Sequence, residues 1–226
     1  MTVSNALRKP VQIAGAPAPD LLSAFLRRHA IRQPDQAAFT CGDRSISWQA
    51  LEETSTGLAR WLLGQGLQAG DRVAVCSLNS IELVQVYLGL FKAGLIAVPV
   101  NTRLKPDEIR YILGHAQPRM AFCEPSLAPM LEQAGATFPL FSKLPDCASD
   151  VGELPAIGPD DFAVIIYTSG TTARPKGVVH THGALCRMAL SGTQVGGTTR
   201  HLRLSFFPMM HVSGLWILAT ALREGS

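Results

Sequence analysis

The chain has 226 residues, of which 47% are hydrophobic and 16% charged. This balance excludes a disordered or highly charged tail protein, and the length is enough to bury a sizeable core. Twenty basic residues against 17 acidic ones leave a formal net charge of +3 without a run of five basic residues, so no nucleic-acid partner is expected.

The first part of the chain predicts two helices on either side of a β-hairpin. Asp20 is a helix-capping residue type and stands before an amphipathic stretch. Gly42 and Asp43 form a turn signal between two β-prone stretches. The expected elements are a helix at residues 21–29, strands at 37–41 and 45–48, and a helix at 49–63.

From residue 72 onward, apolar strands alternate with helices. Ser80 is expected to cap one helix, and Pro106 with two following acids opens another. This β-α-β-α order predicts an α/β fold, in which a layered, mostly parallel sheet is covered by helices on its faces. Strands are expected at residues 72–76, 95–100 and 119–123, with helices at 80–92, from 106 and at 127–134.

Residues 141–161 change character. They hold three prolines, five acids and no sustained periodicity, so they are expected to form a surface connection.

A strongly apolar strand at residues 162–167 runs directly into a small polar loop. Four hydroxyl side chains stand within five residues, two glycines let the backbone approach a ligand closely, and one lysine adds a flexible charge. Together they predict a flexible loop that surrounds a polyphosphate, in which neutral donors make most of the contacts. The residues are Thr168, Ser169, Gly170, Thr171, Thr172, Lys176 and Gly177.

The loop is not a Walker A loop, because five residues separate Gly170 from Lys176 and glycine follows the lysine. A generic P-loop NTPase is therefore disfavoured. Composition alone leaves open a polar turn that binds nothing.

The full string from Tyr167 to Gly177, followed by residues 178–182, closely resembles the phosphate-loop signature of the AMP-forming adenylating superfamily. This superfamily comprises acyl-CoA synthetases, firefly luciferases and peptide-synthetase adenylation domains. Other segments resemble further motifs of the family in the same order: residues 46–51 with 70–73, the lysine-alanine-glycine segment 91–101, and the proline-histidine-glycine segment 207–215.

The resemblance implies a domain organisation. Residues 1–19 are expected to be a loose leader, and residues 20–226 an incomplete N-terminal AMP-binding domain of a truncated chain. The C-terminal part of that domain and the small domain with a catalytic lysine are expected to be missing.

The resemblance also implies a two-step ligase that uses ATP, Mg²⁺ and coenzyme A. A carboxylate attacks the α-phosphate of ATP, and a thiol then displaces AMP. The loop would hold the β- and γ-phosphates, with Lys176 as a catalytic residue. His211 would be the second catalytic residue and would place the acyl group, with Met210 and Trp216 lining the acyl pocket.

One residue departs from the family pattern. Ala173 stands where glycine or serine is preferred, and alanine costs about 1 kcal/mol or more if the position needs a positive φ.

His180 and His182 stand two residues apart, but no third metal ligand is near in sequence, so a structural role is preferred over a metal site.

Several alternatives stay open. The preferred substrate is a fatty or other hydrophobic acid; an amino-acid or aryl-acid adenylation domain and a catalytically dead phosphate-loop fragment are the others. The chain alone is expected to be inactive and to self-associate or need a partner chain, because an unfinished sheet exposes an edge and apolar surface.

The cysteines and apolar stretches bear on location. The five cysteines are widely spaced, odd in number and without a Cys-x-x-Cys pair, which favours buried free thiols in a reducing compartment. Residues 83–100 and 209–222 are interrupted or too short to span a membrane, which needs about 20 apolar residues. No secretory signal is visible, so a cytoplasmic protein is expected.

Overall fold

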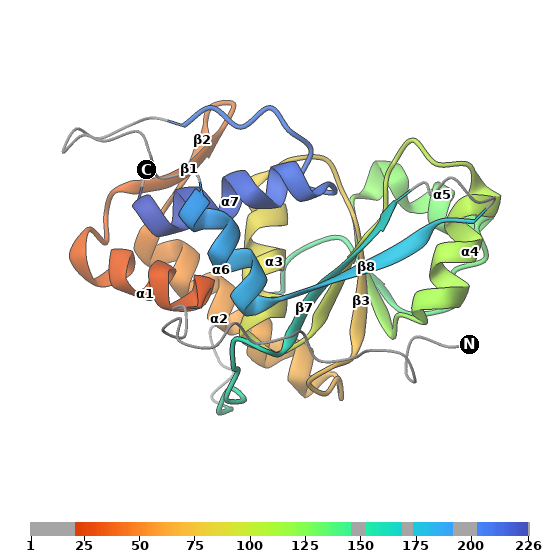
Figure 1. Cartoon of the computed structure of the whole chain (residues 1–226), viewed down its shortest axis with the longest axis horizontal. Coiled ribbons are helices and arrows are strands. Elements are labelled where there is room, and N and C mark those ends of the chain that lie inside the picture. Colours follow the sequence, from red (N-terminus) through yellow and green to blue (C-terminus); the bar gives the residue numbers. More distant parts are fainter. Residues whose placement is uncertain (1–20, 146–151, 169–173, 192–202, 226) are drawn as a thin grey trace.

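The computed structural model describes residues 21–145, 152–168, 174–191 and 203–225. Its centre is a six-stranded sheet with strand order β6-β5-β3-β4-β7-β8 (Figure 1). All neighbouring strands are parallel except β8, which runs antiparallel to β7. The expected mostly parallel α/β fold is confirmed. The strands are β3 (Arg72–Cys76), β4 (Ile96–Pro99), β5 (Met120–Cys123), β6 (Leu140–Phe141), β7 (Phe162–Thr168) and β8 (Lys176–Thr181).

Helices cover both faces of this sheet (Figure 1). One face carries α4 (Pro106–Ala116) and α5 (Ala128–Gln133), the latter preceded by a 3₁₀ turn at Pro125–Leu127. The opposite face is covered by a larger group of helices, and a separate hairpin of β1 (Ala37–Cys41) and β2 (Arg44–Ser47) lies beside them. That group comprises α1 (Leu22–Arg32), α2 (Trp48–Gly64), α3 (Ile81–Lys92), α6 (His182–Ser191) and α7 (Val212–Glu224).

The inner strands are apolar at nearly every position because both faces of the sheet are buried. In β3, Val73 and Val75 belong to the core beneath α2 and α3, whereas Ala74 and Cys76 pack under α4 and α5. This alternation explains why the sequence shows continuous apolar runs instead of a polar face.

The helix starts follow the predicted capping chemistry in two cases. The Ser80 hydroxyl accepts the Leu83 N–H at 3.1 Å, and α4 begins at Pro106, where the Glu108 carboxylate accepts the Lys105 N–H at 2.9 Å. Helix α1 has Leu21 as its N-cap residue, without a side-chain cap. Asp20 and the expected leader lie outside the described residues.

Two strands were not predicted from the sequence. β6 falls at the start of the expected surface connection. There the Phe141 ring centroid lies 5.4 Å from that of Trp61 and 5.3 Å from that of Phe122. These aromatic contacts hold the segment on the sheet edge. β8 follows the polar loop, so the loop joins two antiparallel strands before α6 begins.

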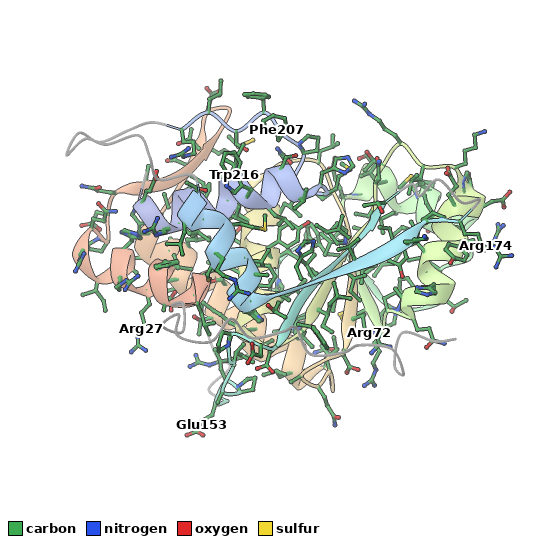
Figure 2. All side chains as sticks on the ribbon, in the orientation of Figure 1. Arg27, Arg72, Glu153, Arg174, Phe207 and Trp216 are labelled. Carbon is green, nitrogen blue, oxygen red and sulfur yellow. The ribbon has the colours of Figure 1, made fainter. Side chains whose placement is uncertain are left out.

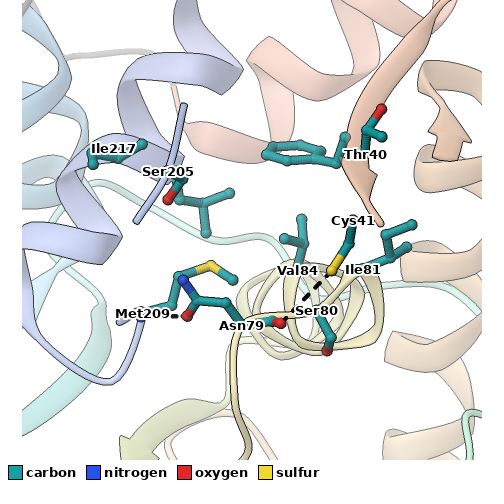
Figure 3. A pocket seen from close by; sticks show the side chains of 11 residues that line it. Thr40, Cys41, Asn79, Ser80, Ile81, Val84, Ser205, Met209 and Ile217 are labelled. Carbon is teal, nitrogen blue, oxygen red and sulfur yellow. Dashed lines mark hydrogen bonds between the residues drawn. The ribbon is translucent and has the colours of Figure 1, made fainter. Parts of the chain in front are cut away.

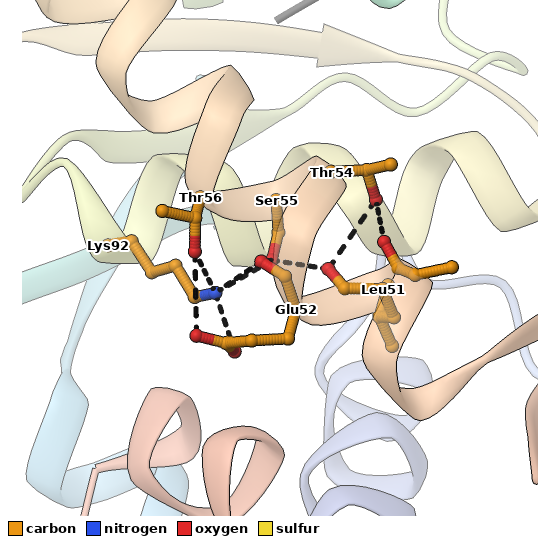
Figure 4. Close-up of polar contacts among 7 residues, drawn as sticks. Leu51, Glu52, Thr54, Ser55, Thr56 and Lys92 are labelled. Atoms are coloured by element: carbon orange, nitrogen blue, oxygen red, sulfur yellow. Dashed lines mark hydrogen bonds and ion pairs between the residues drawn. The ribbon is translucent and has the colours of Figure 1, made fainter. Parts of the chain in front are cut away.

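The lysine of the lysine-alanine-glycine segment joins α3 to α2. Lys92 has a side chain only 5% exposed, and its ammonium donates to the Glu52 carboxylate at 2.7 Å, to Ser55 at 2.9 Å and to Thr56 at 2.8 Å (Figure 4). Burial lowers the pKa of Lys92, and the Glu52 charge opposes this. The segment therefore has a packing role in this fold.

Helix α1 also packs against α7, although they lie at opposite ends of the described chain. Their apolar residues share one core, and the Gln33 amide donates to the Gly225 carbonyl at 3.5 Å. Gly225 has φ 72°, and a β-carbon there would lie 2.4 Å from the His29 ring. Both the positive φ and this close approach favour glycine at the end of α7.

The four described cysteines are free thiols: Cys76, Cys123 and Cys186 are buried, as expected, and Cys41 is exposed. Cys147 lies outside the described residues. In the part of the chain that the structure describes, no helix is both long and apolar enough to cross a membrane.

Candidate functional site

The base of the polar loop is a pair of antiparallel strands. Thr168, the last residue of β7, is the register partner of Lys176, the first residue of β8, and both are exposed. The residues between them include Ser169, Gly170, Thr171, Thr172 and Ala173, all of which lie outside the described residues. The structure thus places the two ends of the predicted phosphate loop opposite each other.

Gly177 is held in close contact with β7. A β-carbon on this residue would lie 2.9 Å from Ile165 Cγ2 and 3.2 Å from Tyr167 Cζ. The glycine therefore lets the Tyr167 ring lie against the neighbouring strand, which is a packing reason for this part of the motif.

A cluster of side chains from α4 supports the loop base. The Tyr167 hydroxyl and His115 Nδ1 share a hydrogen bond of 2.6 Å, and the His115 ring stacks on Tyr111 with centroids 5.8 Å apart. The Arg174 guanidinium, at the far end of the loop, lies 5.6 Å from the Tyr111 ring centroid. Burial, with a smaller contribution from Tyr111, raises the pKa of Tyr167, so the phenol stays protonated. Both ends of the loop are thereby anchored to α4.

The two histidines after the loop have structural positions. His182 is the first residue of α6, is 2% exposed, and its ring makes an edge-on contact with the Phe91 ring. Burial, opposed by the Asp161 charge, lowers its pKa to about 4. Burial also lowers the pKa of His180. Within the described ranges, no three His, Cys, Asp or Glu side chains are grouped so that they could hold a metal.

The proline-histidine-glycine segment forms one compact turn at the start of α7. His211 is the N-cap residue; its N–H donates to the Pro208 carbonyl at 3.1 Å, and its own carbonyl accepts the Gly214 N–H at 3.1 Å. A β-carbon on Gly214 would lie 2.6 Å from Met209 Cα. The three motif residues fix the backbone of His211 while its side chain stays exposed.

An apolar pocket lies beside this turn (Figure 3). Its wall comes from three parts of the chain: β1 through Phe39, Thr40 and Cys41; the start of α3 through Asn79, Ser80, Ile81 and Val84; and the α7 region through Ser205, Met209, Ile217 and Leu218. Sequence reasoning missed these residues. The apolar run in α7 was visible, but nothing in the sequence signals that the β1–β2 hairpin closes the pocket.

Met210 and Trp216, the two predicted pocket residues, are not among those that line this pocket. The Trp216 indole N–H donates to the Met188 carbonyl of α6 at 2.9 Å, and Met210 is half-buried. Figure 2 shows Trp216 beside α6.

Both regions lie at the carboxyl edge of the sheet. Asn79, which follows β3, is hydrogen bonded to Phe207 and Met209, and Thr168 ends β7, which runs in the same direction. β4 lies between β3 and β7, so the strands that lead into the two regions are separated by one strand. Ligands of open α/β sheets bind at this edge.

Comparison with known proteins identifies the family. The AMP-binding enzyme family model matches residues 26–226. The chain belongs to the AMP-binding enzyme family. Among AMP-binding relatives, it is 34% identical over 192 residues to malformin synthetase mlfA of Aspergillus brasiliensis and 30% identical over 222 residues to the sulfoacetate–CoA ligase of Cupriavidus necator.

The matches cover most of this chain but less of each relative. They cover 85% of this chain and 4% of the malformin synthetase, and 89% of this chain and 43% of the ligase. A crystal structure of a putative long-chain-fatty-acid CoA ligase from Rhodopseudomonas palustris aligns with TM-score 0.81 and 26% identity, covering 92% of this chain and 56% of that one. The AMP-binding fold is thus shared over nearly the whole chain, which spans less than half the length of these curated relatives.

Proposed function

We propose that this chain carries the phosphate loop and part of the acid-binding pocket of an ATP-dependent acid–thiol ligase. Such a ligase activates a fatty or other hydrophobic carboxylic acid as its acyl-adenylate and transfers it to coenzyme A. The observation that carries the proposal is the apolar pocket beside the His211 turn, on the same sheet edge as the Thr168–Lys176 pair.

The chemistry sets the requirements of the site. The acid carboxylate attacks the α-phosphorus of ATP and pyrophosphate leaves; the thiol then attacks the acyl carbon and AMP leaves. Because an anion attacks an anion, donors must neutralise the transferred charge. In this proposal the hydroxyls of the loop and Lys176 hold the β- and γ-phosphates. The exposed positions of Thr168 and Lys176 support the assignment.

Mg²⁺ would supply further neutralisation of the phosphates. The described residues offer no grouped set of metal-binding side chains, so none of them is assigned as its ligand.

His211 is proposed to place the acyl group. Its support is the fixed backbone of the turn together with the exposed position of His211, two residues after Met209, which lines the pocket. The Met210 and Trp216 assignments remain proposals that rest on the family motif alone.

The lining of the pocket supports the proposed substrate class. Its lining is dominated by Phe39, Ile81, Val84, Ile217 and Leu218, which suits an apolar acid better than a charged amino acid. The likeness to a malformin synthetase supports the second candidate, an amino-acid or aryl-acid adenylation domain. The third is a fragment that folds without turnover.

An acid-dependent exchange of pyrophosphate into ATP tests these candidates. The 226-residue chain is assayed with octanoate, benzoate and leucine. Exchange with octanoate alone supports the proposal, exchange with leucine or benzoate alone supports the second candidate, and no exchange agrees with the expectation that this chain alone is inactive. Pyrophosphate exchange with any of the three acids would contradict the expectation that the chain is inactive by itself.

Equilibrium ATP binding tests the loop separately. Lys176→Ala should weaken ATP binding at least tenfold, whereas Lys105→Ala, at an exposed lysine before α4, should leave it unchanged. Equal ATP affinity of Lys176→Ala and the parent would overturn the role of Lys176.

Location and self-association are also proposed. The free thiols support a reducing, cytoplasmic location. Self-association is supported by exposed apolar side chains before α7, since Leu204 and Phe206 are 80% and 71% exposed. Light scattering after gel filtration tests this, and a monomer at every concentration would contradict it.

A further inference from the structure

We propose that Asn79 and Tyr87 are positioning residues that clamp the backbone of residues 207–209 and thereby fix His211 beside the acid pocket. The clamp rests on the proposed function for its purpose, because it acts through His211. Its existence rests on three hydrogen bonds between segments more than 120 residues apart in the chain.

Asn79 makes two of these bonds with one side chain. Its amide nitrogen donates to the Phe207 carbonyl at 2.8 Å. Its amide oxygen accepts the Met209 N–H at 2.8 Å (Figure 3). The amide thus pairs with the backbone as a neighbouring strand would. An asparagine satisfies a donor and an acceptor together, which neither aspartate nor leucine can do.

Tyr87 makes the third bond from inside the core. Its side chain is 1% exposed, and its hydroxyl donates to the Met209 carbonyl at 2.8 Å. Burial raises the pKa of Tyr87, which keeps the hydroxyl protonated and able to donate. Asn79 therefore holds the N–H of Met209, and Tyr87 of α3 holds its carbonyl.

The clamped segment lies directly before His211 in the chain. His211 follows Met209 by two residues, and its N–H is bonded to the Pro208 carbonyl inside the clamped segment. Asn79 and Met209 also line the apolar pocket. A shift of residues 207–209 would therefore change both the pocket wall and the backbone position from which the His211 side chain extends.

Three variants separate the contributions. Asn79→Leu removes both hydrogen bonds of the amide and keeps its branched shape. Asn79→Asp keeps the acceptor for Met209, and Tyr87→Phe removes the hydroxyl alone. The matched control is Gln85→Leu in α3, the helix of Tyr87, which loses a hydrogen bond to Thr54 of α2 at 2.8 Å instead of one to residues 207–209.

The first measurement is backbone hydrogen exchange at Met209 in the 226-residue chain, with the β3–β5 amides as internal reference for folding. We expect at least tenfold faster exchange in Asn79→Leu, a smaller increase in Asn79→Asp and in Tyr87→Phe, and none in Gln85→Leu. Unchanged exchange at Met209 in a folded Asn79→Leu overturns the clamp; if that variant does not fold, the same result in Asn79→Asp and Tyr87→Phe does so.

The second measurement is the octanoate-dependent shift of the His211 ring signals by NMR. We expect Asn79→Leu to raise the half-saturating octanoate concentration at least fivefold without changing ATP affinity, with partial recovery in Asn79→Asp. Faster exchange combined with unchanged octanoate affinity would overturn the positioning role. If the parent chain shows no octanoate response, the proposed function fails, and the exchange measurement alone decides the clamp.

Discussion

A β-carbon placed on Gly214 would lie 2.3 Å from the carbonyl oxygen of Pro208. This distance is far inside van der Waals contact, and the opposing atom belongs to the backbone, so it cannot swing aside. The glycine of the motif is therefore what allows residues 208 and 209 to lie over the first turn of α7. The same turn holds His211.

Gly214→Ala should push the His211 turn away from α7 and destabilise the chain by roughly 1–3 kcal/mol, as overpacking of a buried contact does. Urea unfolding followed by circular dichroism measures the loss. The matched control is Gly114→Ala in α4, where the added methyl group meets open space and should stabilise the helix by about 0.5–1 kcal/mol. Equal stability of the parent and Gly214→Ala would contradict the close contact.

The Lys92 cluster should respond asymmetrically to its two partners. Glu52→Gln leaves a buried ammonium without its carboxylate and should cost roughly 3 kcal/mol, whereas Lys92→Met fills the space with apolar atoms and should stay within about 1 kcal/mol of the parent. The Glu52 side chain is 25% exposed and keeps access to water when the lysine is gone. Unfolding free energies of the two variants and of the double variant test the asymmetry; equal costs of the two single variants would refute it.

Stability should fall as the solution is acidified below about pH 6.5. His182 has a pKa of about 4 in the fold, below the usual value of 6.5. Between these values the unfolded chain binds a proton that the folded chain does not, so folding loses free energy as the pH falls. The loss from pH 7 to pH 5 should be roughly 2 kcal/mol for this residue. The lowered pKa values of His29 and His180 act in the same direction.

His182→Gln removes this titration. The pH dependence of its unfolding free energy between pH 7 and 5 should be flatter than that of the parent. A slope identical to the parent would show that His182 is not responsible.

Tyr167→Phe should destabilise the chain by about 1 kcal/mol, because His115 loses a half-buried hydrogen-bond partner. Thermal unfolding measures this effect. His115→Phe should cost a similar amount, and the double variant no more than about the larger single loss, since both remove the same bond. Additive losses would mean that the two side chains act independently.

Much of the fold could be predicted because local chemistry specifies it. Ser80 caps α3 and Pro106 opens α4 where the sequence indicated, and the apolar runs of β3, β4 and β5 are those of a doubly covered sheet. The ordered sequence motifs indicated the AMP-binding enzyme family, and the family match over residues 26–226 confirms it.

The parts that were missed depend on distant contacts. β6 has only two residues, and aromatic packing on Trp61 and Phe122 holds it in place. The pocket wall joins β1 to α7, and the clamp joins Asn79 to Phe207. A single sequence carries no local signal for such pairs, because each residue alone is compatible with many partners. The roles of Lys176, His211, Met210 and Trp216 stay predictions.

The contact between α1 and α7 has a consequence for the order in which the molecule is made. Leu22, Leu26, Leu218 and Leu222 belong to one core, so α1, which also packs against α2, has part of its apolar surface uncovered until nearly 200 further residues have been synthesised. That part of α1 is then open to chaperones during translation. We expect α1 to reach its full native protection only once α7 is present.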